Sequence, residues 1–375
     1  MNARAKAPHT SWSMSNETIR PKDDVMRQRN RLERPGAILL SLATLLSVGH
    51  AEILFVNVRT GNDGNRATQA EPVKTLERAA TLLAEGAAGE PATIIVAPGL
   101  YSLDRCVTIR GRDFTELNRL TIEASVLPDD PQWQPGSMPV IVSTENPDRP
   151  GTPAQPSETY SLKVQVNHVT IQGLKFLGNP LPDNWHCCIE RIGTDLHDLI
   201  VTQCMFLGDR NTSDIYSATL ATGNRFVVDH CVFSNCHACA VFWDGVDGIG
   251  GKGCAMLYCV VDGALISGVW TCQTNKDFEF HHNIVAHSEY VWMRKPNDGQ
   301  KYRVGDCALI GNRYFSGYGL ASGPLGETGP EVKFDKDHIV TEGRLEFASH
   351  EMTHLAERSA GHHLNAGLFR ERQHK

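Results

Sequence analysis

Between residues 166 and 315 the sequence has no helical stripe of apolar residues, and it lacks the leucine and asparagine consensus of leucine-rich repeats. Without a helical stripe, a fold of alternating strands and helices is disfavoured. Without the consensus, the leucine-rich repeat solenoid, which has a similar period, is disfavoured too. The apolar run at residues 36–48 is too short to cross a bilayer comfortably. Basic residues are not in excess, because 36 Lys and Arg stand against 43 Asp and Glu. Nucleic acid is therefore a poor candidate partner.

What the sequence contains is a repeated pair of short strands across residues 166–315. Each unit has one strand, a polar pair or kink, and a second strand. The residues that close the six units are Phe176, Phe206, Phe233, Val261, Val285 and Phe315, which gives steps of 30, 27, 28, 24 and 30 residues. Strand-type alternation with a period in the twenties predicts a parallel β-helix with one coil per repeat, and coils about 4.8 Å apart.

One column of the repeat is rich in cysteine. The residues two positions before the first five closing residues are Leu174, Cys204, Cys231, Cys259 and Asn283. Alternation places this column on the same side as the closing residues, so it should point inward. The chain has eleven cysteines, an odd number, and we interpret them mainly as buried thiols. Cys236 and Cys239 have metal-like spacing, but a second converging pair of ligands is not evident.

Residues 1–51 are expected to be an extension followed by a signal peptide. The basic segment 27–34 precedes the apolar run, and small residues precede a cleavage site after Ala51. Met26 would start a signal peptide of ordinary length, so the start is either Met1 or Met26. An N-terminal membrane anchor is the alternative. The mature chain would be secreted, periplasmic or at the cell surface, with 28 basic residues (36 − 8) against 39 acidic ones (43 − 4).

The segment that starts at residue 52 carries motifs in a characteristic order. They are an alternating strand at 53–58, Gly-Asn-Asp-Gly at 61–64, Pro-Val-Lys-Thr-Leu-Glu-Arg-Ala at 72–79, and Ile-Ile-Val-Ala-Pro-Gly-Leu-Tyr at 94–101. This order resembles the N-terminal cap and first coil of right-handed parallel β-helix proteins with the pectin-lyase-like fold. The resemblance covers roughly residues 52–370. It implies an all-β solenoid whose short helix, expected at 77–83, covers the open end of the first coil.

We therefore expect one β-helix domain over residues 52–375. Its parts are the cap and first coils at 52–127, regular coils at 166–324, and a closing segment at 325–375. Within that segment, residues 355–368 resemble the final cap seen after many β-helices. Residues 128–158 are interpreted as a long loop interrupted by a strand at 140–142, with an interdomain linker as the alternative.

The resemblance also implies which surface is functional. In this superfamily the third strand of each coil forms the sheet along which substrates lie, flanked by loops. The expected third strands are 187–192, 216–220, 240–244, 265–270 and 290–295. Aromatic rings stack on sugars, and Arg binds carboxylates, so the candidate polysaccharide-binding residues are Trp243, Trp270, Trp292, Arg191 and Tyr290. The alternative is that the tryptophans are interior, since alternation does not place all three on one face.

A lyase that acts on uronates needs a base and a cation that neutralises the substrate carboxylate. The resemblance implies Lys or Arg as base, often with calcium held by carboxylates. Lys295 and Arg294 are the candidate bases, and Asp244 and Glu190 are the candidate calcium ligands. The chain lacks the clustered aspartates of well-marked lyases and the spaced signature of polygalacturonases. The histidines at 230, 281 and 282 fall on the kink, where a hydrogen-bonded turn is the preferred interpretation.

The function expected from the sequence is an exported, monomeric protein that binds polysaccharide and cleaves uronate-containing polymers by β-elimination. A non-catalytic glycan-binding or surface module is one alternative. A glycoside hydrolase is another, and it would need two facing carboxylates. No cofactor other than calcium, no nucleic acid and no stable membrane span in the mature chain are expected.

Overall fold

The computed structural model describes residues 51–146, 157–181, 184–243, 251–271, 277–294, 302–317 and 336–370. These residues belong to one compact unit, residues 49–375. The expected extension and signal peptide lie outside the described residues, so they stay predictions. In the described parts of the chain, no helix is both long enough and apolar enough to cross a membrane.

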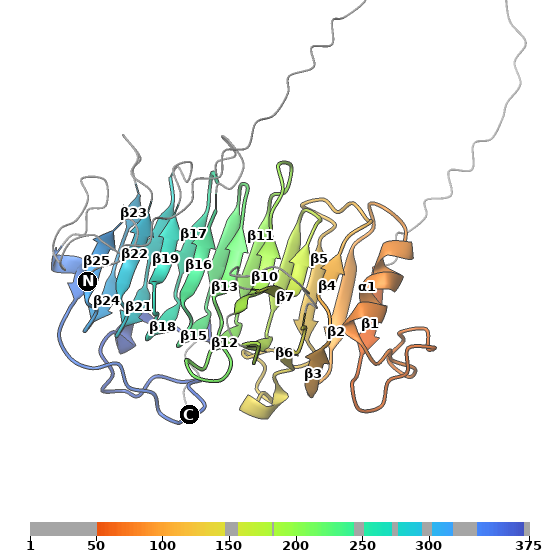
Figure 1. Ribbon diagram of the computed structural model, residues 1–375, viewed down its shortest axis with the longest axis horizontal. Helices are drawn as coiled ribbons and strands as arrows, with labels where there is room; N and C mark the ends of the chain where they lie inside the picture. The colour runs from red at the N-terminus through yellow and green to blue at the C-terminus, as the bar shows by residue number, and fades with distance from the viewer. Residues whose placement is uncertain are drawn as a thin grey trace, which may run out of the picture. The chain divides into compact units, whose positions relative to one another are not determined.

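The described strands form three sheets of parallel strands, and each coil contributes one strand to each sheet (Figure 1). Sheet A contains β1 (Glu52–Val56), β2 (Ala92–Val96), β5 (Leu120–Ala124), β8 (Val169–Gln172), β11 (Leu199–Thr202), β14 (Phe226–Asp229), β17 (Ala255–Leu257), β20 (Glu279–His281) and β23 (Arg303–Val304). Sheet B contains β3 (Leu100–Leu103), β6 (Val140–Ser143), β9 (Lys175–Leu177), β12 (Met205–Leu207), β15 (Val232–Ser234), β18 (Val260–Asp262), β21 (Asn283–Ala286), β24 (Cys307–Ile310) and β26 (Ile339–Val340).

Sheet C contains β4 (Val107–Ile109), β7 (Ser157–Val164), β10 (Asn184–Arg191), β13 (Ser217–Ala221), β16 (Ala238–Phe242), β19 (Ser267–Thr271), β22 (Tyr290–Arg294) and β25 (Tyr314–Gly317). Strands that are neighbours in a sheet come from successive coils. Along the chain, they are separated by strands of the other two sheets. Parallel strands joined in this way wind with a right-handed sense. The parallel β-helix predicted from the repeat, and the right-handed sense implied by the resemblance, are therefore confirmed.

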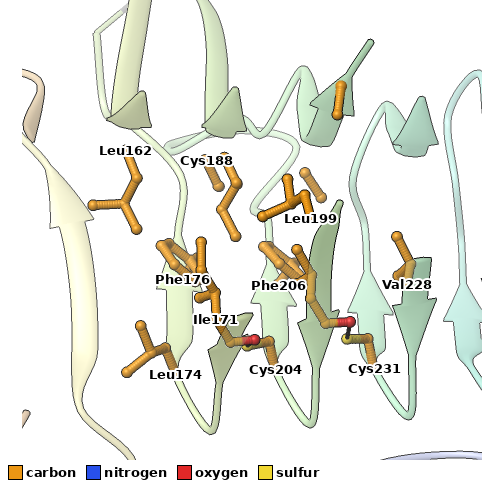
Figure 2. Close-up of a cluster of buried hydrophobic side chains, with 14 of the residues drawn as sticks. Leu162, Ile171, Leu174, Phe176, Cys188, Leu199, Cys204, Phe206, Val228 and Cys231 are labelled. Carbon is orange, nitrogen blue, oxygen red and sulfur yellow. Dashed lines mark hydrogen bonds between the residues drawn. The ribbon is translucent and has the colours of Figure 1, made fainter. Parts of the chain in front are cut away.

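The interior is filled by columns of side chains that stack from coil to coil (Figure 2). The rings of Phe176 and Phe206 are parallel with centroids 5.1 Å apart, and Phe233 continues the stack at 4.9 Å. In the next column, Cys204 and Cys231 are fully buried, and each thiol donates to a backbone oxygen of the preceding coil. The inward cysteine column is therefore confirmed.

The described cysteines are all free thiols. Cys236 and Cys239 are both buried. No group of three or more His, Cys, Asp or Glu side chains among the described residues could hold a metal ion. The metal-like spacing of this pair therefore reflects two inward positions on either side of a corner.

The sixth repeat closes earlier than predicted. Leu309 of β24, and not Phe315, is in register with Val285. Residues 314–317 form β25, which pairs with β22 in sheet C. The prediction was wrong because it took a strand of sheet B and a strand of sheet C in the same coil for one repeated pair.

Five successive coils pass from sheet A to sheet B through a residue in the left-handed region. These residues are Gly173, Gln203, His230, Tyr258 and His282, with φ between 47° and 73°. The ring of Tyr258 stacks on His230 and on His282, with both centroid distances 4.7 Å. The histidines on the kink therefore belong to a stacked ladder of turns.

A second set of left-handed residues precedes sheet A, and Asp198 is its centre. The carboxylate oxygen Oδ2 accepts hydrogen bonds from Arg119 Nη1 at 2.5 Å and from His168 Nδ1 at 2.7 Å. Burial would raise the pKa of Asp198, but these hydrogen bonds and the charges of Arg119 and Arg225 outweigh it and lower the pKa. The corner thus joins successive coils by charge as well as by packing.

The N-terminal end is covered by α1 (Leu76–Glu85), as predicted. Its first turn is capped by Thr75, whose side chain accepts from the backbone N–H of Arg78 at 3.2 Å. The apolar face, which includes Leu83, packs onto the first coil against β1 and β4. The helix therefore covers apolar side chains that would otherwise face water.

The C-terminal segment covers the outer side of sheet B. Leu364 and Leu368 join an apolar cluster with Val232 and Val260. Gln203 Nε2 donates to the backbone oxygen of Leu368 at 3.1 Å. Three short 3-10 helices complete the described secondary structure: η1 (Pro135–Ser137), η2 (Lys336–His338) and η3 (His362–Leu364). The segment expected to cap the last coil thus lies along the side of the coils.

Replacing Phe206 by Ala should lower the free energy of unfolding by about 3–5 kcal/mol, because it opens a cavity between two stacked rings. Urea denaturation followed by circular dichroism measures this. The control is Leu117→Ala, since Leu117 is 93% exposed, and its effect should stay within about 0.5 kcal/mol. Equal effects of the two changes would contradict the stacked interior.

Asp198→Asn should destabilise the protein by about 3 kcal/mol at pH 7, because it removes the charge from a buried ion pair. The folded-state pKa of Asp198 is lowered, so its contribution is complete above the unfolded pKa of about 3.9. It is then lost as the pH falls through the folded pKa. The difference from wild type, measured by urea denaturation, should therefore shrink below about pH 4. The exposed Asp195→Asn should show neither effect.

Candidate functional site on the outer face of sheet C

Strands of sheet C have two outward positions separated by two inward ones. In β7, Ser161 and Leu162 are both buried, whereas Tyr160 and Lys163 on either side of them are not. Lys163 Nζ lies 3.5 Å from the centroid of the Tyr160 ring, so both side chains occupy the same face. The strand therefore departs from simple alternation, and residues three apart become neighbours on the outside.

The same pattern recurs in β19. Val269 belongs to the interior cluster, and a Cβ on Gly268 would lie 3.1 Å from the side chain of Val285, which is also interior. Ser267 and Trp270 therefore take the two outward positions. The register runs from Tyr160 and Lys163 to Ser267 and Trp270 through β10, β13 and β16.

Two residues expected to bind ligand lie in the interior instead. Arg191 is fully buried, and its Nη2 donates to the backbone oxygen of Thr222 at 2.7 Å. Trp292 is fully buried and donates from Nε1 to Thr271 Oγ1 at 2.8 Å. Arg191 follows the outward Glu190, and Trp292 precedes the outward Met293, but both face inward. This corrects the expectation that their side chains line a binding surface.

The other predicted binding residues lie on the outside. Trp243 and Trp270 are brought together, with half-buried rings edge to face at a centroid distance of 5.9 Å. Tyr290 occupies the outward position in register with Ser267, but it is only 1% exposed and stacks on Tyr314 at 5.0 Å. The tryptophan pair is therefore the part of the predicted aromatic set that the structure brings together.

Most of the side chains predicted as base or calcium ligand fall outside the part of the chain that the structure describes. Lys295 and Asp244 lie outside the described residues. Arg294 ends β22 in register with Thr271, and its side chain also lies outside them. Glu190 faces outward and pairs with Lys163, with Oε1 and Nζ 3.6 Å apart. A calcium role for Glu190 and Asp244 stays a prediction.

Glu190 belongs to a polar cluster that we call the β7–β10 cluster. It consists of four residues on β7 and β10 together with Glu145, which follows β6: Glu145, Glu158, Tyr160, Lys163 and Glu190. The Tyr160 hydroxyl donates to Glu158 Oε2 at 3.0 Å. Glu145 Oε2 accepts from the backbone N–H of Tyr160 at 3.2 Å. Because Lys163 packs on the ring and also pairs with Glu190, the cluster surrounds one tyrosine with three carboxyl groups and one cation.

Partial burial perturbs the protonation of this cluster. Burial raises the pKa of Glu190, and the nearby Lys163 charge opposes the rise. Burial also raises the pKa of Tyr160, and the carboxylates of Glu190 and Glu158 add to that shift. Perturbed groups gathered on one face are typical of acid–base sites. The raised pKa makes Glu190 the group of this cluster that is suited to keep a proton.

A row of aromatic rings runs from this cluster across the next coils. Trp185, in register with Glu158, is 42% exposed. Its ring stacks on Tyr216 at 5.0 Å, and Tyr216 contacts the ring of His237 at 5.6 Å. Burial lowers the pKa of His237, with Asp214 opposing, so the row carries little charge at neutral pH. It offers apolar contact beside the polar cluster.

The sequence contained signals for this site that the prediction did not use. Tyr160 and Lys163 belong to β7, which begins at Ser157, where a loop was expected to end. Trp185 precedes the expected start of its strand at residue 187. Tyr216 begins the expected strand 216–220, but it was not named among the candidate binding residues. Glu190 alone among the cluster was predicted, in a different role.

No protein-family model and no curated protein matches the chain. Solved structures with similar folds include a rhamnogalacturonan lyase, with TM-score 0.40 and 10% identity, covering 78% of this chain and 87% of that one. A GH136 lacto-N-biosidase from Eubacterium ramulus gives 0.41 and 11%, covering 71% and 57%. Pectate lyase Pel9A gives 0.38 and 11%, covering 76% and 82%. Similarities this low assign no activity to the chain.

Lys163→Met should raise the pKa of Glu190 further, because it removes the charge that opposes the effect of burial. Carboxyl-carbon NMR titration of the two proteins measures the shift. Lys252→Met, an exposed lysine outside the cluster, should leave the Glu190 titration unchanged. A Glu190 pKa that is the same or lower in Lys163→Met would show that the two groups are not coupled as described.

Proposed function

We propose that the chain is a carbohydrate-active β-helix protein that binds a glycan along the outer face of sheet C and hydrolyses a glycosidic bond at the β7–β10 cluster. The observation that carries the proposal is the exposed ring of Trp185 in register with Glu158, whose carboxyl group acts on Tyr160 together with that of Glu190. An aromatic ring gives a sugar an apolar contact surface. Two carboxyl groups in different environments supply the acid and the base that glycoside hydrolysis needs.

In this proposal Glu190 is the general acid. Its raised pKa favours the protonated form, which can donate to the oxygen of the departing sugar. Glu158 acts on the other side, either as base towards water or as nucleophile. Tyr160 donates to Glu158, so it orients that carboxylate. Lys163 opposes the rise in the pKa of Glu190.

β-Elimination on a uronate polymer is the second candidate. Lys163 is the described cation of the cluster, and it already pairs with Glu190. Three carboxyl groups around it would repel a uronate carboxylate unless a divalent cation intervened. This route therefore requires calcium, whereas hydrolysis does not. Non-catalytic glycan binding is the third outcome.

Incubation of the full chain with neutral and acidic polysaccharides, with calcium and with chelator, separates these reactions. We expect new reducing ends without the ultraviolet absorbance of unsaturated uronates, and no loss of activity in chelator. Glu190→Gln should lower the rate at least about 100-fold, the scale of general acid catalysis. Unsaturated ends that require calcium would replace hydrolysis by β-elimination.

The matched control is Glu71→Gln, because Glu71 is an exposed glutamate remote from sheet C, before α1. It should keep the wild-type rate. Trp185→Ala should weaken glycan binding while leaving the urea denaturation profile close to wild type, since the ring is exposed. If glycans bind and neither product forms on any polysaccharide, the catalytic part of the proposal fails and the binding part remains.

A further inference from the structure

The β7–β10 cluster carries more negative than positive charge. Its three carboxyl groups belong to Glu145, Glu158 and Glu190, and the described cation among them is Lys163. Even when Glu190 keeps its proton, as its raised pKa favours, two carboxylates stand against one ammonium group. The charge of the cluster therefore bears on which sugars it can bind.

Two of the three carboxyl groups have no cation of their own. Glu145 accepts a hydrogen bond from the Tyr160 backbone and Glu158 accepts one from the Tyr160 hydroxyl, but neither forms an ion pair in the described part of the chain. The neighbouring residues outside the description, 147–156 and 182–183, contain two Asp and one Arg, so they bring no excess of positive charge. The exposed Glu158 thus faces water without a counter-ion.

Lys163 shows how this cluster holds an ammonium group. Its Nζ lies 3.5 Å from the centroid of the Tyr160 ring and 3.6 Å from Glu190 Oε1. Trp185 and Glu158 repeat this combination of ring and carboxyl group on neighbouring strands in register, but the described part of the chain supplies no ammonium to them. An ammonium group placed there would gain both a charge-assisted hydrogen bond and a cation–π contact.

The ring of Trp185 directs a ligand towards Glu158. Tyr216, which precedes β13, stacks on one side of the ring, whereas Glu158 lies on the β7 side, and the side chain of Trp185 remains 42% exposed. A sugar against the uncovered part of the ring is therefore close to Glu158. A uronate would bring a like charge there, which is repulsive, and a neutral sugar would leave the carboxylate without a counter-ion.

We propose that the sugar unit bound beside Trp185 is a protonated amino sugar, so that the substrate is a glycan of cationic units. Trp185 contacts the sugar ring, and Glu158 accepts a hydrogen bond from the ammonium group. The proposal rests on the proposed function, because it places the substrate at the same cluster. A carboxylate accepts about four hydrogen bonds, so Glu158 can hold an amino group on one ring atom and still face the adjacent anomeric carbon.

The test is calorimetric titration of the full chain with linear tetrasaccharides of glucosamine, N-acetylglucosamine, glucose or galacturonate. Each is made in α-1,4 and β-1,4 linkage, with sulfur in the glycosidic bonds so that it resists cleavage. The pH is one at which the free glucosamine tetramer is protonated. We expect this tetramer, in one linkage, to bind at least about tenfold more tightly than the others, the scale of one hydrogen bond to a charged group. Added salt should weaken its binding.

Two variants change the charge of the cluster in opposite directions. Glu158→Gln should weaken binding of the glucosamine tetramer about tenfold, while its amide oxygen can still accept from the Tyr160 hydroxyl. Lys163→Met should tighten the same binding, because it removes a positive charge beside the ligand. The matched control Glu71→Gln, remote from sheet C, should change nothing. Unchanged affinity in Glu158→Gln, or weaker binding in Lys163→Met, would overturn the proposal.

Further outcomes separate a sugar from other cations, and this proposal from the proposed function. Hexalysine or calcium that binds as tightly as the glucosamine tetramer, with the same dependence on Glu158, would overturn sugar recognition. Hydrolysis of a neutral or acidic glycan without tight binding of the glucosamine tetramer would overturn the cationic substrate alone. Glu158-dependent binding of that tetramer, with no cleavage of glucosamine polymers, would keep the amino sugar and overturn the hydrolase.

Discussion

Stacking of equivalent positions in successive coils is the constraint on which the structure depends. Each coil is held only by its neighbours, as Phe206 is held between Phe176 and Phe233. A slip of one residue in any strand would turn its inward side chains outward. The single left-handed residue at the corner between sheets A and B prevents such a slip, because it keeps the connection equally short in each of these coils.

In sheet C the same stacking leaves freedom on the outer face. Two consecutive inward residues leave two outward rows, and the chemistry of those rows changes from coil to coil without disturbing the interior. One row holds Lys163 and Glu190 in the early coils and Val241 and Trp270 in later ones. A stretch of charged side chains and a stretch of uncharged ones therefore belong to the same pair of rows.

The sequence predicted the coils much better than it predicted the site. In sheets A and B alternation is regular, so the inward cysteines could be placed correctly. In sheet C two consecutive inward residues break the alternation. Residues such as Arg191 and Trp292 therefore face inward although a direct neighbour in the sequence faces outward. Tyr160 was missed because its strand follows a segment rich in Pro, Ser and Gly, which has the composition of a loop. Aligning the third strands by their paired inward residues would have revealed both rows.

The C-terminal segment has a consequence for the order of folding. Leu368 is bonded to Gln203, 165 positions earlier in the chain, and with Leu364 it shields Val232 and Val260. During synthesis the coils can stack one after another as they emerge, because their contacts are with adjacent coils. The apolar side chains on the outer face of sheet B then stay exposed to water until residues 364–368 have been synthesised. A nascent chain that ends before these residues would expose an apolar surface and could aggregate with other nascent chains on the same mRNA. A chaperone that binds this surface would therefore act mainly late in translation.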